Sequence, residues 1–483
     1  MTETMNKGSA HLDKLWLFLG PFLFLLTCFT SSPEGLSEQG WRTAGLAMWL
    51  AVWWVSETVP IPVTSLVPLL AVPLAGINDI KSTSSAYSHP LIFLFLGGFL
   101  ISIAMEKSQL HKRIALKTML KSGTNPKYQI LAMMLVSGFL SMWINNTATT
   151  LMLLPIALSV IHVLQSNGNG CDNYAKALLL AIAYSASLGG VGTIIGTAPN
   201  ALMVAYLWDN YQIKIGFAQW MIVAVPFTFG MILLCWVWLT KFAFKLTPQE
   251  ENSALTEVFS SQLAELGKMS LAQKNVLFVF LFAVFGWLLR PYLQTWTGLG
   301  ITDTGIAIAA SILLFVLPAS KDGQKVMDWA AAKDVPWGIL LLFGGGLTLA
   351  SQIKGSGLAA YIANVLAGAS AIPIVLGVIA VAALITFLTE LTSNTATAAG
   401  FLPLLGPVAE QVTGTPLIWI IPAAMAASCA FMMPVATPPN AIVFGSGEIR
   451  IRDMVKAGFV LNIIAITMIS ILTLTVAKWV FAF

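Results

Sequence analysis

Trp143-Ile-Asn-Asn-Thr-Ala-Thr-Thr150 is a short run of amide and hydroxyl side chains between two strongly apolar segments. A second run, Leu391-Thr-Ser-Asn-Thr-Ala-Thr-Ala398, has the same kind of surroundings, and Asn146 and Asn394 are 248 positions apart. Unpaired polar groups in hydrocarbon cost several kcal/mol of free energy. Each run, called here a polar island, is therefore expected to line something polar: an ion, a substrate or water.

The composition of the chain indicates a membrane protein. Its 483 residues are 57% hydrophobic and 10% charged, whereas a soluble protein carries roughly 25% charged residues. Apolar runs recur along the chain, which predicts an all-α polytopic membrane protein with about 11 transmembrane helices and two re-entrant hairpins. The net charge of +4 does not indicate a nucleic-acid partner. The four cysteines form no CxxC pair, so neither a metal site nor a disulfide is expected.

Each polar island lies at the centre of a long apolar segment, at 130–164 and at 372–408. Such a segment provides two half-crossings, either as one broken spanning helix or as a re-entrant hairpin with the island at its tip. Irregular backbone is tolerated at membrane depth only where it is buried in protein or lines a cavity. Both alternatives therefore place the islands inside the protein.

Two further spans, 175–207 and 416–444, are interrupted near their middle. The first contains Gly-Thr-Ala-Pro-Asn at 196–200, within a glycine-rich stretch. The second contains Pro-Val-Ala-Thr-Pro-Pro-Asn at 434–440. Glycine at this density, with proline, predicts unwound helices at both places.

Three landmarks recur in the same order in the two halves of the chain. Gly97-Gly98 matches Gly345-Gly346 and the two islands match each other, both at an offset of 248, while Asn200 matches Asn440 at an offset of 240. With both island segments re-entrant, five crossings separate the glycine landmarks, and an odd number inverts the repeat. Inverted repeats with broken helices at mid-membrane are typical of secondary transporters.

The basic residues test this topology. With the amino terminus in the cytoplasm, 19 of the 25 Lys and Arg residues fall in segments assigned to the cytoplasmic side, which favours that orientation. The protein is thus expected to be a multi-pass protein of the cell (inner) membrane with an extracytoplasmic carboxyl terminus. The basic residues left on the outer side are Arg42, Lys81, Lys214, Arg290, Lys354 and Lys478.

The island chemistry fits two kinds of ligand. Asn and Thr oxygens, with exposed backbone carbonyls, suit a hard monovalent cation. Hydroxyl and amide donors, with the positive ends of half-helices, suit a carboxylate. No Lys or Arg lies near either island, so an anion would be held by neutral donors and bound cations. The alternative is a packing role, because Ser, Thr and Gly are common at helix contacts in membranes.

These motifs together resemble the divalent anion:sodium symporter (DASS) family, the bacterial sodium/dicarboxylate transporters related to animal di- and tricarboxylate carriers. The resemblance covers roughly residues 15–480 and includes Ser56-Glu-Thr-Val-Pro-Ile-Pro62 besides the islands and breaks. It implies a homodimer and an elevator mechanism. The implied organisation is a cytoplasmic N-terminal tail at 1–14, scaffold helices at 15–127 and 275–370, a cytoplasmic linker at 246–274, and transport-domain hairpins and broken helices at 128–245 and, with the last helix, 371–483.

The resemblance also implies ligand residues at the matching positions. One sodium site would use Ser141, Asn145, Asn146 and Gly196, and the other Thr389, Thr392, Asn394 and Ala436, partly through backbone carbonyls. Substrate carboxylates would contact Asn145, Asn146, Thr147 and Thr197 from the first half and Ser393, Asn394, Thr395, Thr437 and Pro438 from the second.

Three residues need separate interpretation. The family's Ser-Asn-Thr stands at 393–395, but the first island has the bulkier Asn145 in place of the serine. Glu390 is an intramembrane carboxylate, which suits either a proton or cation ligand or a structural hydrogen-bond partner inside the hairpin. Glu57 lies at a turn, which favours a capping or dimer role over transport.

The leading functional hypothesis is sodium-coupled symport of C4 dicarboxylates such as succinate, malate or fumarate. A sodium-independent dicarboxylate or citrate exchanger on the same fold is the alternative, and sulfate transport is a third. The sequence contains no P-loop, HExxH or Ser-His-Asp pattern, so an enzyme is not expected. A channel has no need of two occluding hairpins.

Overall fold

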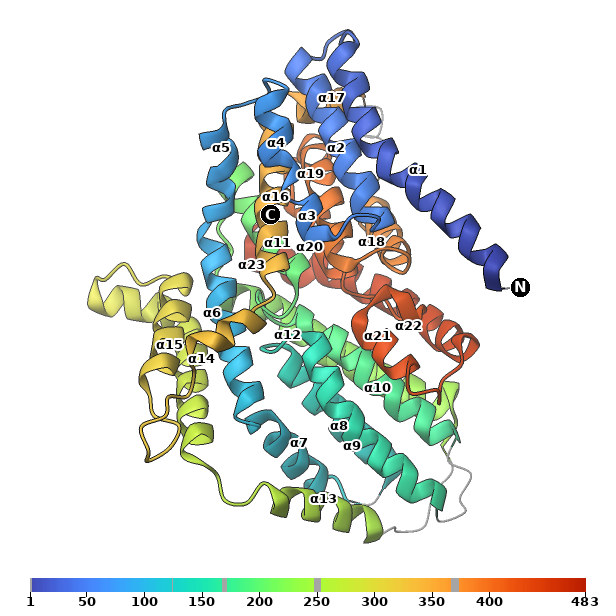
Figure 1. Ribbon diagram of the computed structural model, residues 1–483, viewed down its shortest axis with the longest axis vertical. Helices are drawn as coiled ribbons and strands as arrows, with labels where there is room; N and C mark the ends of the chain where they lie inside the picture. The colour runs from blue at the N-terminus through green and yellow to red at the C-terminus, as the bar shows by residue number, and fades with distance from the viewer. Residues whose placement is uncertain (1, 124, 167–171, 247–252, 366–372) are drawn as a thin grey trace.

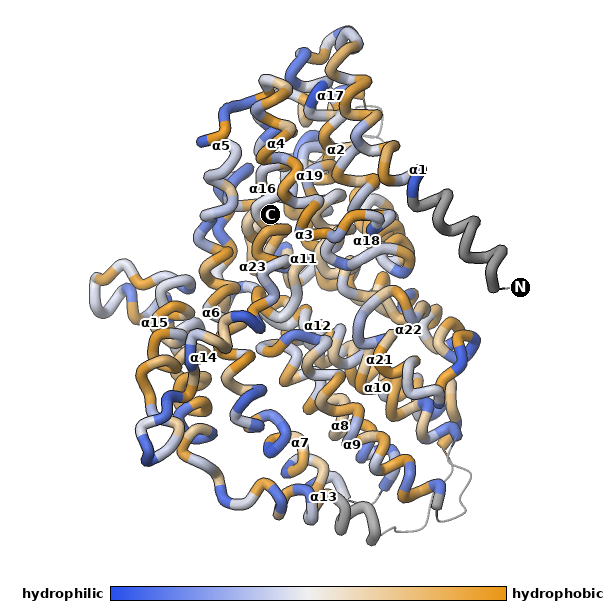
Figure 2. The backbone as a smooth tube through the Cα atoms, in the orientation of Figure 1, coloured by the Kyte–Doolittle hydropathy of each residue, from blue (hydrophilic) through white to orange (hydrophobic). Residues whose placement is uncertain are grey.

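The computed structural model describes residues 2–123, 125–166, 172–246, 253–365 and 373–483, and over these residues the protein is helical, with one isolated β-bridge (Figure 1). Apolar residues cover most of the helices, and hydrophilic residues gather mainly at helix ends and connections (Figure 2). Among the described residues, seven helical segments are long and apolar enough to cross a membrane: Ile80–Lys107, Asn146–Gln165, Asp172–Val191, Phe217–Ala243, Leu271–Thr297, Trp337–Gly355 and Ile451–Phe481.

The first half begins with α1, which is helical from Thr2, so residues 2–14 of the expected tail form one continuous helix with the apolar segment that follows them. The apolar stretch at 61–74 forms two short helices, α3 and α4. Pro68 has no N–H to bond within a helix, and its ring clashes with the preceding turn, so the helix restarts at Val67. The helices are α1 (Thr2–Phe29), α2 (Glu38–Ser56), α3 (Ile61–Thr64), α4 (Val67–Leu74), α5 (Ile80–Ser85), α6 (Pro90–Lys107) and α7 (Leu110–Lys121).

Each polar island separates two helices that contact each other. The first pair is α8 (Pro126–Ser141) and α9 (Asn146–Ser166), which lie side by side in Figure 1, and the second is α18 (Ile374–Thr389) and α19 (Asn394–Thr413). The tips at 142–145 and 390–393 have the same succession of turn, bend and extended residue. The hairpin alternative is therefore the observed one, although α9, with 21 residues, is longer than a half-crossing.

Both interrupted spans are broken helices, as expected. α10 (Asp172–Val191) stops before α11 (Ala198–Tyr211), and α20 (Leu417–Ala426) stops before α21 (Pro438–Phe444). In the first break the Asn200 amide donates to the carbonyls of Val191 and Thr193, at 3.0 and 2.7 Å. In the second, Asn440 donates in the same way to Ala430 and Met433, at 3.2 and 3.0 Å. The matched asparagines thus hold the unwound carbonyls of both breaks.

The second break starts earlier than its prolines indicate, because helix α20 ends at Ala426 and not near Pro434. Glu390 at the tip of the second hairpin holds the later part of this break. Its carboxylate accepts the backbone N–H groups of Phe431, Met432 and Met433 at 2.7–3.0 Å, and the Asn462 amide at 2.8 Å. A buried carboxylate with four donors is satisfied by the protein itself. Of the two roles considered for Glu390, this geometry supports the structural one.

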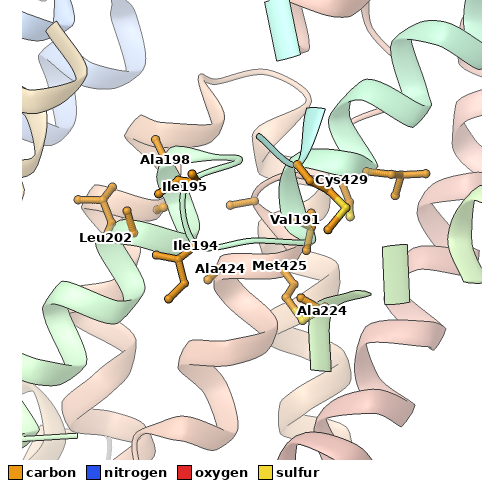
Figure 3. Packing of buried hydrophobic residues seen from close by; sticks show 14 of the residues in the cluster. Val191, Ile194, Ile195, Ala198, Leu202, Ala224, Ala424, Met425 and Cys429 are labelled. Carbon is orange, nitrogen blue, oxygen red and sulfur yellow. The ribbon is translucent and has the colours of Figure 1, made fainter. Parts of the chain in front are cut away.

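The two breaks also pack together. Val191, Ile194 and neighbouring residues of the first break lie against α20 of the second half, where Ala424 and Met425 are fully buried (Figure 3). The Thr197 and Ser428 hydroxyls are 3.4 Å apart across this contact. The halves are therefore joined at the level of their breaks.

The matched glycine pairs permit close helix contacts with different neighbours. A Cβ at Gly97 would lie 2.8 Å from the carbonyl of Ala307 in α15 (Asp303–Val316). One at Gly345 would lie 2.6 Å from the carbonyl of Ser65, in the connection between α3 and α4. Any larger residue would push these backbones apart.

The linker expected at 246–274 contains the helix α13 (Ser253–Glu265), and residues 247–252 before it lie outside the described part. The domain boundary expected near 370 also lies outside the described residues. Helix α14 begins with a capping box, in which Ser270 and Gln273 satisfy each other's backbone N–H groups. The remaining helices are α12 (Phe217–Val237), α13 (Ser253–Glu265), α14 (Leu271–Thr297), α15 (Asp303–Val316), α16 (Trp337–Gly355), α17 (Leu358–Val365), α22 (Ile451–Leu472) and α23 (Lys478–Phe481), with short 3-10 or π segments between some of them.

Candidate functional site

A cavity of about 430 Å³ lies where the two hairpin tips and the two helix breaks meet. This volume is in the usual range of small-molecule sites. All nine residues expected to contact substrate line it: Asn145, Asn146, Thr147, Thr197, Ser393, Asn394, Thr395, Thr437 and Pro438. The structure thus brings together residues that are more than 200 positions apart in the chain.

Four helices begin at this cavity. The first residues of α9, α11, α19 and α21, which are Asn146, Ala198, Asn394 and Pro438, all line it. The amino end of a helix carries a partial positive charge that attracts anions. In α21 only this dipole contributes, because Pro438 and Pro439 have no N–H and the Asn440 N–H donates to the Thr437 hydroxyl. Two such ends come from each half of the chain, so the cavity has favourable surroundings for a ligand with two negative ends.

The two island asparagines are held in the same way. The Ser141 hydroxyl donates to Oδ1 of Asn146 at 2.5 Å, and the Thr389 hydroxyl donates to Oδ1 of Asn394 at 2.7 Å. In both cases the hydroxyl ends one hairpin arm and the amide begins the next. This bond turns each side-chain oxygen toward the hairpin and leaves the Nδ2 group available as a donor.

Gly190 makes room for Asn146, and Gly190 and Gly196 lie close together. A Cβ at Gly190 would lie 2.8 Å from its Oδ1 and 3.0 Å from the carbonyl oxygen of Gly196. A Cβ at Gly196 would in turn lie 2.5 Å from the carbonyl oxygen of Gly190. The Asn146 amide oxygen and the Gly196 carbonyl oxygen both lie close to Gly190, and oxygens of this kind are the ligands that hard cations prefer.

The residues expected to hold sodium divide into two groups. Asn145, Asn146, Gly196, Asn394 and Ala436 line the cavity. The other three residues lie behind it: Ser141 and Thr389 contact the island asparagines, and the Thr392 hydroxyl is 2.6 Å from that of Thr397. Asn145 uses its side-chain oxygen locally, accepting the Thr147 N–H at 2.8 Å. Their roles as ligands stay predictions.

Sequence reasoning missed the rest of the cavity wall. Glu57 follows α2, Phe95 and Phe99 belong to α6, and Ile339 belongs to α16. The turn and capping position expected for Glu57 are confirmed, since it ends α2 with φ +50°. Its place on the cavity wall was not expected. No local pattern identifies these residues, because only the tertiary packing of α2, α6 and α16 brings them to the islands.

A second cavity, of about 370 Å³, lies between α11, α16, α17 and α19 and includes Lys354 and Glu410. It contains neither island nor break. The first cavity is therefore the candidate site.

An all-helical membrane protein whose sequence-related halves each supply a hairpin tip and a broken helix to one polar cavity has the architecture of a secondary transporter. Residues 12–483 match the family described as the sodium:sulfate symporter transmembrane region, and the chain belongs to this family. It is therefore a transporter and not an enzyme. The resemblance found in the islands, the breaks and the Ser56–Pro62 stretch is confirmed.

Named relatives are similar over nearly the whole chain. The sodium-dependent dicarboxylate transporter of Staphylococcus saprophyticus is 40% identical over 463 residues, which is 94% of this chain and 89% of that protein. The protein of the same name in Staphylococcus aureus USA300 is 40% identical over 459 residues, which is 93% of this chain and 88% of the relative.

Among solved structures, the YdaH transporter of Alcanivorax borkumensis has a similar fold. The TM-score is 0.59, and the match covers 90% of this chain and 98% of that one. Sequence identity is 13%, so this likeness concerns the fold alone.

Proposed function

We propose that this protein couples the movement of sodium ions to the uptake of C4 dicarboxylates such as succinate, malate and fumarate. One observation carries the proposal: the amino ends of four helices, two from each half, open on one cavity whose lining, among the residues that the structure describes, contains no Lys, Arg or His. A substrate with a carboxylate at each end matches this two-sided arrangement. The names of the Staphylococcus relatives support the same substrate class.

Sodium serves in this proposal to offset the charge of the dianion. We place one ion near Ser141, Asn145, Asn146 and the Gly196 carbonyl, where the first hairpin tip meets the first break. We place the second near Thr389, Thr392, Asn394 and the Ala436 carbonyl. With both ions bound, each island asparagine presents an oxygen to a cation and its Nδ2 to the substrate.

The size and shape of the cavity favour an organic dianion over sulfate, although sulfate appears in the family description. Sulfate concentrates its charge on one small tetrahedron, whereas the groups that line this cavity of about 430 Å³ come from both halves of the chain. A chain of four carbons separates two carboxylates, so that each can approach one half of the protein.

We further propose that transport follows an elevator mechanism in a homodimer in the cell inner membrane. The hairpins and broken helices would form the moving part, with α2, α6 and α16 in the fixed part. The distribution of basic residues supports a cytoplasmic amino terminus and an extracytoplasmic carboxyl terminus.

Uptake of radiolabelled succinate into proteoliposomes tests the proposed function. An inward sodium gradient is expected to drive accumulation, and replacing it with potassium should abolish it. Equal uptake under both conditions, with exchange against internal succinate, would instead identify a sodium-independent exchanger. Competition by unlabelled malate, citrate and sulfate then ranks the substrates.

A further inference from the structure

The cavity described above contains one titratable side chain among its lining residues, that of Glu57. No hydrogen bond or ion pair to this carboxylate is present within the described residues, and the side chain is exposed. A negative charge on the wall of a site for a dianion opposes binding, so its presence needs a functional explanation.

The backbone at Glu57 does not explain the choice of glutamate. The residue ends α2 in the left-handed region, at φ +50°, and its N–H bonds to the Trp53 carbonyl at 3.0 Å. Gly or Asn would adopt this conformation with less strain, and neither the turn nor the cap uses the Glu57 side chain. Local backbone structure therefore does not account for the carboxylate.

The position of Glu57 relative to the ligand groups is informative. The proposed ligands belong to the hairpins and breaks, whereas Glu57 follows α2 and shares the remaining wall with Phe95 and Phe99 of α6 and Ile339 of α16. It is therefore a fixed charge that faces the ligand set without belonging to it. The electrostatic interaction of this carboxylate with the cavity contents depends on the net charge of the bound ions and substrate together.

We infer that Glu57 makes anion binding depend on bound cations. This inference rests on the proposed function. When the cavity holds a dianion alone, two like charges face the carboxylate and repel it. When two sodium ions are also bound, the complex is neutral and the repulsion largely disappears. Glu57 thus disfavours the state in which the dianion is bound without sodium, and it favours the neutral complex of the dianion with two sodium ions.

The test measures the coupling between sodium and succinate in the purified full-length protein. The succinate dissociation constant is obtained in choline chloride and in saturating sodium chloride, and the coupling ratio is the first divided by the second. Glu57→Gln is expected to lower this ratio about tenfold, equivalent to about 1.4 kcal/mol. The change should come from tighter binding without sodium, while binding in saturating sodium changes less than about twofold.

Three further variants separate charge from structure. Glu57→Asp should keep the coupling ratio near that of the parent. Glu57→Asn should lower it as Gln does, while the thermal unfolding midpoint does not fall, because Asn suits the left-handed conformation. Glu34→Gln removes an exposed carboxylate from the connection before α2 and should change nothing.

Two different failures are distinguishable. A parent protein that binds succinate equally with and without sodium would overturn the proposed function. A parent with strong coupling, and a Glu57→Gln variant with the same ratio, would overturn the role of Glu57 alone. Equal weakening of succinate binding in both salts would also contradict it, because that result indicates an ordinary binding or structural contribution.

Discussion

Ser141 donates its hydroxyl hydrogen bond to Oδ1 of Asn146 across the tip of the first hairpin, at 2.5 Å. The bond fixes which end of the amide points into the cavity. The second half repeats it between Thr389 and Asn394, so the two hairpins offer equivalent donors to a shared ligand. The predictions below begin from this pair of contacts.

Replacing either island asparagine should abolish transport. Asn146→Ala and Asn394→Ala each remove an amide that we place between an ion and the substrate, so we expect sodium-driven succinate uptake to fall at least about 100-fold. Asn364→Ala, at an exposed asparagine of α17, is the matched control and should transport normally. Near-normal uptake by either island variant, at equal protein incorporation, would contradict the site.

Removing the hydroxyl that orients each asparagine should weaken sodium binding and leave the fold intact. Ser141→Ala and Thr389→Ala leave the asparagine oxygen without its donor, and we expect the sodium concentration for half-maximal uptake to rise about 3- to 30-fold. Thr389→Ser keeps a hydroxyl and should remain close to the parent. If Thr389→Ser behaves like Thr389→Ala, the methyl group and not the hydroxyl is responsible.

A methyl group at Gly190 should disturb the first ion site directly. The added Cβ would lie 2.8 Å from the Asn146 oxygen, which must then move. We expect Gly190→Ala to raise the half-maximal sodium concentration at least about tenfold. Gly400→Ala in α19, where a Cβ meets nothing within 4 Å, is the control. Equal behaviour of the two variants would show that Asn146 does not need its present position.

Glu390 should prove structural. Glu390→Gln replaces an acceptor oxygen with a donor opposite backbone N–H groups, which we expect to destabilise the protein by about 2–4 kcal/mol and to lower its thermal unfolding midpoint. Glu410→Gln, at an exposed carboxylate of α19, should leave the midpoint unchanged. In the Glu390→Gln protein that remains folded, the sodium dissociation constant should match the parent. An unchanged midpoint with weaker sodium binding would instead identify Glu390 as a cation ligand.

Ligand binding should stabilise the protein only when both partners are present. At succinate concentrations of 100 times the dissociation constant, stabilisation of about 2.7 kcal/mol is expected. The thermal unfolding midpoint should therefore rise with sodium and succinate together and stay unchanged with succinate in potassium. A rise of the same size in potassium would argue against coupled binding.

The repeat, the hairpins and the positions of the islands could be predicted because they follow from one local rule. Polar groups such as Asn146 and Asn394 are too costly in hydrocarbon to face lipid, and glycine and proline mark the breaks. A search along the sequence therefore found the residues that meet in the cavity. Their order and spacing also indicated that the halves are related.

Two features could not be predicted, because their causes lie far away in the chain. In the second break, the carboxylate of Glu390, 41 residues before Phe431, accepts the N–H groups of Phe431, Met432 and Met433, which a continuous helix would use. Glu57 reaches the cavity only through the packing of α2 against the rest of the protein. Neither the composition near Ala427 nor the turn near Glu57 contains that information.

The four helix ends at the cavity also affect the net charge of the ligand groups when no substrate or ion is bound. Backbone dipoles provide attraction for an anion without adding a formal charge, whereas an arginine in their place would leave a bare positive charge after release. Returning one such charge against the membrane potential would require about 2.3 kcal/mol per 100 mV. Ligand groups of zero net charge let the unloaded site reset almost independently of voltage.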